Sequence, residues 1–209
     1  MSNHDLYQRY REVGQQLHNK ILDEYSDREL ILNSAEALGI EHDGRNILYD
    51  FRSDMTVHYE FMLYEYRWDG KTAAERYYEN ESWETDIERT VLEATLEAET
   101  SLFEITETSE ADNRLVVTDL LADSKHSVLD INLSTTAVAG VLLFFRPIQY
   151  EAFTMTSGVS FPFPDEKRDW VLDEYESQVN QSAQQLSSMQ RYVSFYEMYR
   201  EHGIRMSYV

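Results

Sequence analysis

The sequence of residues 101–163 is SLFEITETSEADNRLVVTDLLADSKHSVLDINLSTTAVAGVLLFFRPIQYEAFTMTSGVSFPF, and this stretch decides the fold. It is the only part of the chain with sustained alternation of apolar and polar residues. At its start, Phe103 and Ile105 fall on one face while Glu104 and Thr106 fall on the other. This period of two is typical of a half-buried β-strand.

About six short strands are expected in this block, separated by turn-forming residues at 109–113, 122–125 and 157–158. Pro147 lacks a backbone donor, so the strand that contains it ends at an edge or a bulge. No helical pattern interrupts the block, which favours an antiparallel meander, as a small barrel or a strongly twisted sheet. The expected strands are residues 102–107, 115–121, 128–133, 138–145, 153–156 and 159–163.

Helical periodicity flanks the block on both sides. Before it, apolar residues at spacings of three and four predict helices over residues 5–25, 27–38, 53–69 and 83–98. Residues 46–51 fit a short strand or the approach to a helix equally well. After the block, residues 165–201 contain no Gly or Pro and predict either one projecting helix or two helices that break near Ser187-Ser188.

These patterns predict an α+β fold with N-terminal helices, a central antiparallel β-meander or small barrel, and a long C-terminal helix. We expect a helical region at 1–98, a β region at 99–164, and a C-terminal helix at 165–209 that packs on the N-terminal region. The whole chain is expected to form one compact unit, since 209 residues can bury a sizeable core.

The β block resembles an uncharacterised domain of bacterial and archaeal hypothetical proteins. Some of those proteins also carry a Cys-rich SEC-C zinc motif, like the tail of the SecA translocase. That motif is absent here because the chain has no Cys. The resemblance covers about residues 100–163 and implies no activity and no functional residue. It rests on residues 101–105, 117–121, 128–130 and 133–134, on Gly140 and on residues 145–147.

Acidity is the main compositional feature, with 39 acidic residues against 18 basic ones and a net charge of −21. Such a field repels phosphate backbones and anionic lipid surfaces, so neither nucleic acid nor a membrane is an expected partner. The charge fits either a halophilic-like adaptation to high salt or a cationic partner. We favour salt adaptation, because the acidic residues are spread along the whole chain rather than gathered in blocks.

The absence of Cys excludes disulfides and thiolate zinc sites. The first residues lack a basic region followed by an apolar one, so no signal peptide is expected, and no apolar run is long enough for a membrane span. A cytoplasmic location is therefore the expectation.

One cluster has the residue types of a hard-metal site: Asp119, Asp123, His126 and Asp130 surround a single predicted turn. A solvated acidic turn is the simpler interpretation, and we favour it. The chain contains no nucleophile elbow, no phosphate-binding glycine loop and no metal-binding His pair. We therefore predict no catalytic residue, no metal ligand and no cofactor.

Aromatic residues beside arginines mark the C-terminal helix. Tyr and Arg are enriched at interface hot spots, so this helix is a candidate contact surface for a protein partner or for a homodimer. Packing within the chain is the competing interpretation, although the residues cover a wide arc for one intramolecular face. The interface candidates are Arg191, Tyr192, Phe195, Tyr196, Tyr199 and Arg200.

The leading functional hypothesis is thus a non-enzymatic protein-interaction module. The alternative is an enzyme or small-ligand binder with a carboxylate and histidine site between the sheet and the helices.

Overall fold

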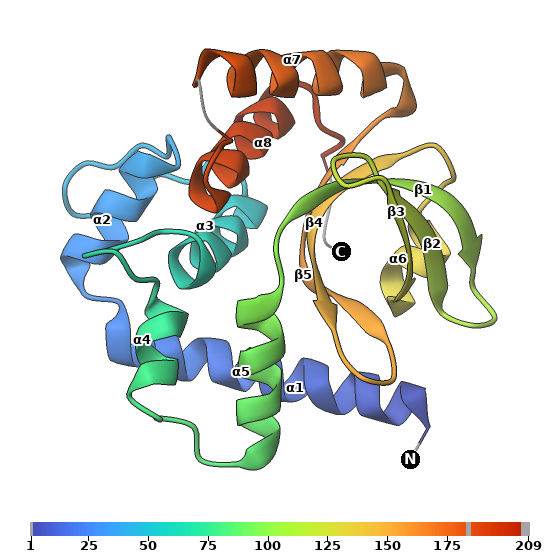
Figure 1. Cartoon of the computed structure of the whole chain (residues 1–209). Coiled ribbons are helices and arrows are strands. Elements are labelled where there is room, and N and C mark those ends of the chain that lie inside the picture. The colour runs from blue at the N-terminus through green and yellow to red at the C-terminus, as the bar shows by residue number, and fades with distance from the viewer. Residues whose placement is uncertain (1, 183–184, 206–209) are drawn as a thin grey trace. The chain divides into compact units, whose positions relative to one another are not determined.

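A computed structural model describes residues 2–182 and 185–205 (Figure 1). Within these ranges the chain forms two compact units. The first, here called the helical unit, ends at Glu97, and the second, the barrel unit, begins at Ala98. The α+β architecture predicted from the sequence is confirmed: helices come first, strands lie in the middle, and helices end the chain.

The helical unit contains five helices in its described residues. Four lie at or near the positions that apolar periodicity predicts, although the third ends at Tyr64 rather than at residue 69, and α4 is an additional short helix. Side chains cap several of their first turns. Ser2 and Asp5 form a capping box on the first helix, and the Asp27 carboxylate accepts a hydrogen bond from the Leu30 amide at the start of the second. The helices are α1 (Asn3–Tyr25), α2 (Arg28–Ala37), α3 (Arg52–Tyr64), α4 (Ala73–Glu79) and α5 (Asp86–Glu97).

The barrel unit is built on five strands that close into a barrel in the order β1-β2-β3-β5-β4. All pairs are antiparallel except β3 with β5, which run parallel and pair at Val128 and Thr154. Of the two arrangements predicted, the small barrel is the one formed. The strands are β1 (Ser101–Ser109), β2 (Arg114–Asp119), β3 (Ser124–Leu129), β4 (Leu142–Gln149) and β5 (Thr154–Phe163).

A short helix, α6 (Ile131–Thr136), connects β3 to β4. A five-stranded barrel with this strand order and a helix at this position has the topology of an OB fold, a Greek-key barrel. A fold of this kind hosts many activities, so the topology by itself assigns no function.

The prediction of a strand over residues 128–133 is wrong in its second half. Asp130 ends β3, and its Oδ1 accepts hydrogen bonds from the amides of Asn132 (3.1 Å) and Leu133 (3.0 Å), which start α6. The other carboxylate oxygen accepts a hydrogen bond from the Thr156 hydroxyl at 2.6 Å. A local cap therefore outweighs the alternating pattern.

Two further boundaries differ from the prediction. The apolar segment at 138–145 enters the sheet only at Leu142, and Val138 is 65% exposed. Ser157 and Gly158 do not separate two strands, because β5 is continuous through them, with Gly158 at φ 107°. Only glycine adopts that angle without strain, so the strand bends there and continues. The register shifts between Phe145 and Pro147, which agrees with the bulge, one of the two alternatives predicted there. The strand does not end at Pro147, however, because β4 continues to Gln149.

Apolar side chains fill the barrel and also cover the outside of β4 and β5. The interior cluster consists of Phe103, Ile105, Leu115, Val117, Val128, Leu143 and Phe145. On the outer side, Phe144 stacks on Phe195 with ring centroids 4.2 Å apart, and Phe161 stacks on Tyr199 at 5.2 Å. Burial on both faces explains why β4 is almost continuously apolar.

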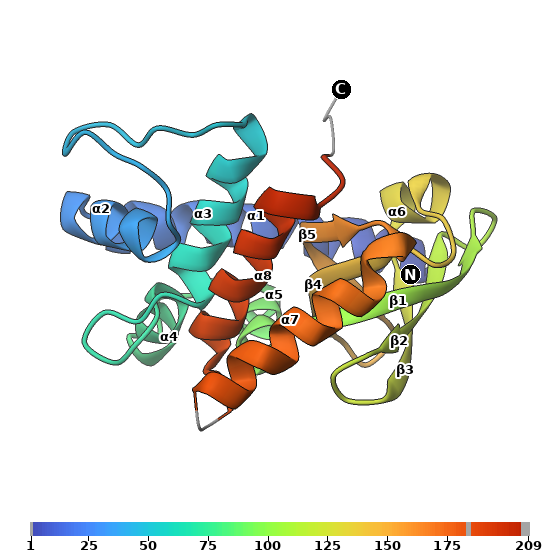
Figure 2. The same ribbon diagram turned by 90° about the horizontal axis from the view of Figure 1, so that it is seen from above.

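The C-terminal segment is broken, as the serines near 187 allow. A 3-10 turn, η1 (Asp165–Lys167), leads into α7 (Arg168–Gln181), and a capping box between Ser187 and Gln190 starts α8 (Ser188–His202). Figure 2 shows α7 and α8 as two separate helices that run in different directions. Packing of the C-terminal helix on the N-terminal region stays a prediction. No helix in the described ranges is long and apolar enough to cross a membrane.

Replacing Asp130 with Ala should lower the free energy of unfolding by about 2 to 3 kcal/mol, because α6 loses its cap and the Thr156 hydroxyl loses a buried acceptor. Urea denaturation of the whole chain measures the change. Glu151→Ala removes an exposed carboxylate from a loop of the same unit and should change stability by less than about 0.5 kcal/mol. Equal effects of the two substitutions would contradict the role assigned to Asp130.

Candidate functional site

The four residues of the predicted acidic turn lie at both ends of the barrel. At one end, Asp119 Oδ1 accepts hydrogen bonds from the Ser101 hydroxyl (2.7 Å) and from the amides of Leu121 (2.8 Å) and Ala122 (3.0 Å). His126 Nε2 lies 2.9 Å from the Ser124 hydroxyl at the same end. Asp123 occupies the turn with φ 49°.

Asp130 directly follows the other end of β3. At the rise per residue of an extended strand, it lies roughly 20 Å from Ser124, where β3 begins. Asp119 and Asp130 both accept backbone hydrogen bonds that hold a turn or a helix start. The described residues contain no group of three or more acidic or His side chains that could hold a metal ion. The structure therefore does not gather these four residues into one site.

The aromatic candidates of α8 face the barrel. Phe195 stacks on Phe144, while Tyr192, Tyr196 and Tyr199 all contact the Phe161 ring, with centroids between 5.2 and 5.7 Å away. All four side chains are at most 3% exposed. Their wide arc, which favoured an interface in the sequence, is thus used at least in part for packing inside the barrel unit. An interface role for them stays a prediction.

The two arginines of the same helix have different surroundings. Arg191 is 9% exposed, and its Nη2 lies 3.3 Å from the Glu99 carboxylate. Arg200 is exposed, with its guanidinium carbon 5.9 Å from the centre of the Tyr196 ring. Of the predicted interface residues, Arg200 is the one whose side chain reaches solvent.

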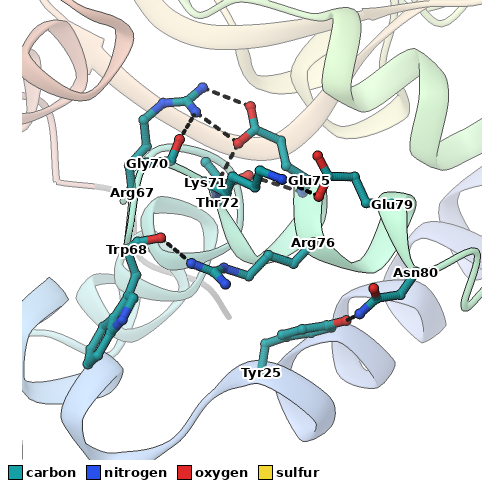
Figure 3. A network of polar contacts seen from close by, with 10 residues as sticks. All are labelled: Tyr25, Arg67, Trp68, Gly70, Lys71, Thr72, Glu75, Arg76, Glu79 and Asn80. Atoms are coloured by element: carbon teal, nitrogen blue, oxygen red, sulfur yellow. Dashed lines mark hydrogen bonds and ion pairs between the residues drawn. The ribbon is translucent and has the colours of Figure 1, made fainter.

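A dense polar network surrounds a small hairpin in the helical unit (Figure 3). Trp68 and Lys71 exchange backbone hydrogen bonds of 3.0 and 3.2 Å across an Asp69-Gly70 turn. Both turn residues have positive φ, 50° and 83°, as a type I′ turn requires.

Two ion pairs anchor this hairpin to α4. The Arg67 guanidinium donates two hydrogen bonds of 2.8 Å to the Glu75 carboxylate, and it also donates to the carbonyl of Gly70 at 2.9 Å (Figure 3). Lys71 Nζ lies 2.5 Å from the Glu79 carboxylate. Arg67 and Lys71 are each matched by an acid, and the third basic group, Arg76, donates a hydrogen bond to the carbonyl of Trp68. The arrangement therefore fixes the hairpin and leaves little charge with which to bind a ligand.

The second cluster of the helical unit is centred on His58 of α3, which is fully buried. Its Nε2 lies 2.8 Å from the Ser34 hydroxyl of α2, and its Nδ1 lies 2.8 Å from the Tyr49 hydroxyl. Burial lowers the pKa of the imidazole to about 4, so the ring is neutral at pH 7. Burial, together with Tyr59 and Asp54, raises the pKa of the Tyr49 hydroxyl to about 12.

The Ser34 hydroxyl also lies 3.1 Å from the carbonyl of Ile31. A hydroxyl has one proton to donate, so all three bonds are satisfied only if Tyr49 donates to Nδ1, Nε2–H donates to Ser34, and Ser34 donates to Ile31. In this tautomer His58 cannot take a proton from Ser34. The arrangement therefore ties α2, α3 and the loop before α3 together and does not activate a nucleophile.

That loop presents apolar side chains to solvent. Leu48 is 51% exposed and Phe51 is 48% exposed, and Tyr59, next to His58, is 38% exposed. These three residues are called the loop patch below. The sequence signal was present in the apolar run at 47–51, but it has no helical or strand period. The interface predicted from the sequence lay on the C-terminal helix and did not include this segment.

One surface hollow lies on α7 and is lined by residues of that helix alone: Asp173, Glu176, Ser177, Asn180 and Gln181. It contains no His and no apolar wall, which small-molecule sites usually have.

Comparison with known proteins gives one family. A family model described as "Family of unknown function (DUF7986)" matches residues 1–209. The match agrees with the expectation of an uncharacterised domain, and it shows no link to the SEC-C motif. No curated protein and no solved structure matches the chain.

Gly70→Ala should destabilise the protein by about 1 to 2 kcal/mol, because an Ala at φ 83° is strained even though no atom lies within 4 Å of the added carbon. Gly14→Ala is the matched control, since its added carbon would lie 3.8 Å from a Val91 methyl group in an ordinary contact. This change inside α1 should stabilise the protein by about 0.5 to 1 kcal/mol. Thermal unfolding measures both changes: the melting temperature should fall for Gly70→Ala and rise for Gly14→Ala.

Protonation of His58 should destabilise the folded state. The pKa of His58 falls from its ordinary value of 6.5 to about 4 on folding, so the unfolded chain binds the proton first. The associated stability is present above pH 6.5 and is lost as the pH falls to about 4, a change of about 3 kcal/mol. His58→Gln removes this titration. The difference in unfolding free energy between the wild type and this variant should therefore shrink between pH 7 and pH 4, and parallel pH profiles would refute the assignment.

Proposed function

Because the chain belongs to the DUF7986 family of unknown function, we propose its function from geometry and charge: it is a non-enzymatic module that binds a cationic protein through the loop patch. The carrying observation is the concentration of exposed apolar side chains in one short segment. Three of the five large hydrophobic residues that are exposed in the described ranges are Leu48, Phe51 and Tyr59. Exposed apolar groups that gather in this way are characteristic of binding surfaces.

Backbone and side-chain hydrogen bonds hold this loop in place. The Leu48 amide donates to the Glu41 carbonyl at 2.8 Å, and the Phe51 amide donates to the Asp54 carboxylate at 3.1 Å. Between them, Tyr49 is bonded to His58. A loop that is already ordered pays little conformational entropy on binding, which favours affinity.

Charge indicates the kind of partner, because an acidic surface that arose as an adaptation to salt still attracts cationic proteins. The net charge of −21 attracts cationic surfaces and accelerates association with them. It also opposes contact between two copies of the chain. We therefore favour a basic protein that has an apolar pocket or ridge over self-association, and we expect no contact with nucleic acid.

The enzyme alternative has weaker support. Asp54 and His58 are both buried and lie one turn apart on α3. Both ring nitrogens of His58 are occupied by Ser34 and Tyr49, so no acid–base pair faces a substrate.

A synthetic amphipathic helix of Leu and Lys provides a defined probe, and a Leu and Glu helix of the same length is its control. Isothermal titration at fixed ionic strength should detect binding of the Lys peptide only. The double substitution Leu48→Ser with Phe51→Ser should weaken this binding at least tenfold, because it removes both apolar anchors. Val138→Ser, at an exposed apolar residue of the barrel unit, should leave the affinity unchanged.

Light scattering in low salt and in about molar salt separates the proposal from its main competitor. We expect a monomer in both conditions. A dimer that is lost on Leu48→Ser with Phe51→Ser would show that a second copy occupies the patch. Equal binding of the Lys and Glu peptides would contradict the charge argument.

A further inference from the structure

Two arginines flank the segment that leads into β1. The β1–β4 register pairs Ser101 with Phe145, which places Arg146 beside residue 100, and Arg146 donates a hydrogen bond to the carbonyl of Ala98. From α8, Arg191 approaches the same segment, with its Nη2 3.3 Å from the Glu99 carboxylate. Arg146 is 3% exposed and Arg191 is 9% exposed, so two guanidinium groups are buried at one place in the barrel unit.

Three buried groups around this segment lack a hydrogen-bond partner among the described residues: Nε of Arg191, the Thr100 hydroxyl and the Ser194 hydroxyl. Thr100 is 1% exposed and Ser194 is 3% exposed. Thr100 follows Glu99 directly, and Ser194 lies about one turn after Arg191 on α8. The three groups thus come from the two stretches of chain that the contact between Arg191 and Glu99 brings together.

All three groups can donate, and the guanidinium can only donate. A buried charge without a close counter-charge is costly, as is a buried donor without an acceptor. Glu99 provides little compensation, because its side chain is 80% exposed and such contacts are screened by water. These buried donors require a hydrogen-bond acceptor, preferably one that carries a negative charge.

We propose that Arg191, Thr100 and Ser194 bind a small inorganic anion, either chloride or an oxyanion such as phosphate, with Arg146 as a second positive charge beside it. The site does not depend on the loop patch, which lies in the other unit. A chain of net charge −21 repels anions in general. At this site the nearby buried donors attract an anion strongly enough to overcome that repulsion, because charges interact more strongly where water is excluded. Bound anion links the start of β1 to α8 and stabilises the barrel unit.

Thermal unfolding of the whole chain tests the proposal in potassium chloride, potassium phosphate and potassium gluconate at one potassium concentration and pH 7. The cation is constant, so screening of the acidic surface by potassium is the same in all three. Phosphate also stabilises folded proteins in general because it is excluded from their surface, and this part of each shift is measured with Arg191→Gln and subtracted. The melting temperature should be higher by several degrees in chloride or phosphate than in gluconate, and the difference should grow with anion concentration. Whichever of the two anions gives the larger shift identifies the ligand.

Arg191→Gln should abolish this anion-specific shift. Arg200→Gln is the matched control, because it removes the same charge from an exposed position of the same helix and should retain the shift. If Arg191→Gln does not fold, Thr100→Val removes one donor and should weaken the apparent anion affinity severalfold. Identical melting temperatures in the three salts, or a full shift in both Arg191→Gln and Thr100→Val, would overturn the proposal and leave an ordered water as the missing partner.

Discussion

Closure of the barrel depends on one carboxylate, that of Asp130. It stops β3, starts α6 through two backbone amides, and holds Thr156 of β5. A parallel pair cannot be joined by a tight turn, so β3 and β5 can meet only if the chain leaves the sheet and returns. Asp130 starts the helix by which the chain leaves the sheet, and it also bonds to Thr156 of β5, the strand that later pairs with β3. A single residue between two apolar runs therefore contributes to both parts of this topology.

Much of the fold follows from local chemistry and was predictable. The helix start at Asp27 follows from a side chain that caps a backbone amide, and the register shift beside Pro147 follows from its missing donor. What the residue pattern did not reveal is which neighbour each apolar residue meets. Alternation at 128–133 looks the same whether the residues extend a strand or enter a capped helix. Likewise, the aromatic arc of α8 could equally have covered a partner, and only the strands β4 and β5 show what fills part of it.

The candidate sites show the same limit more sharply. Asp119 and Asp130 are near each other in sequence and yet lie at opposite ends of the β2–β3 hairpin, so spacing suggested a cluster that geometry separates. His58 lies on α3, but its partners Ser34 and Tyr49 belong to other segments of the chain. No period in the sequence marks Leu48 and Phe51, because their exposure results from a loop held by Glu41 and Asp54 at a distance.

The β3–β5 pairing also bears on how the barrel forms. The strands β1, β2 and β3 follow one another through short turns, and β4 and β5 form a second hairpin, so these pieces involve contacts that are close along the chain. Two pairings between these pieces, β1 with β4 and β3 with β5, join residues far apart in sequence. The second, the seam at Val128 and Thr154, is the shortest pairing in the barrel and so gains least when it forms. Long loops are costly to close before their contacts form. The seam is therefore the natural last step of folding, and also the place where local opening of the native barrel begins.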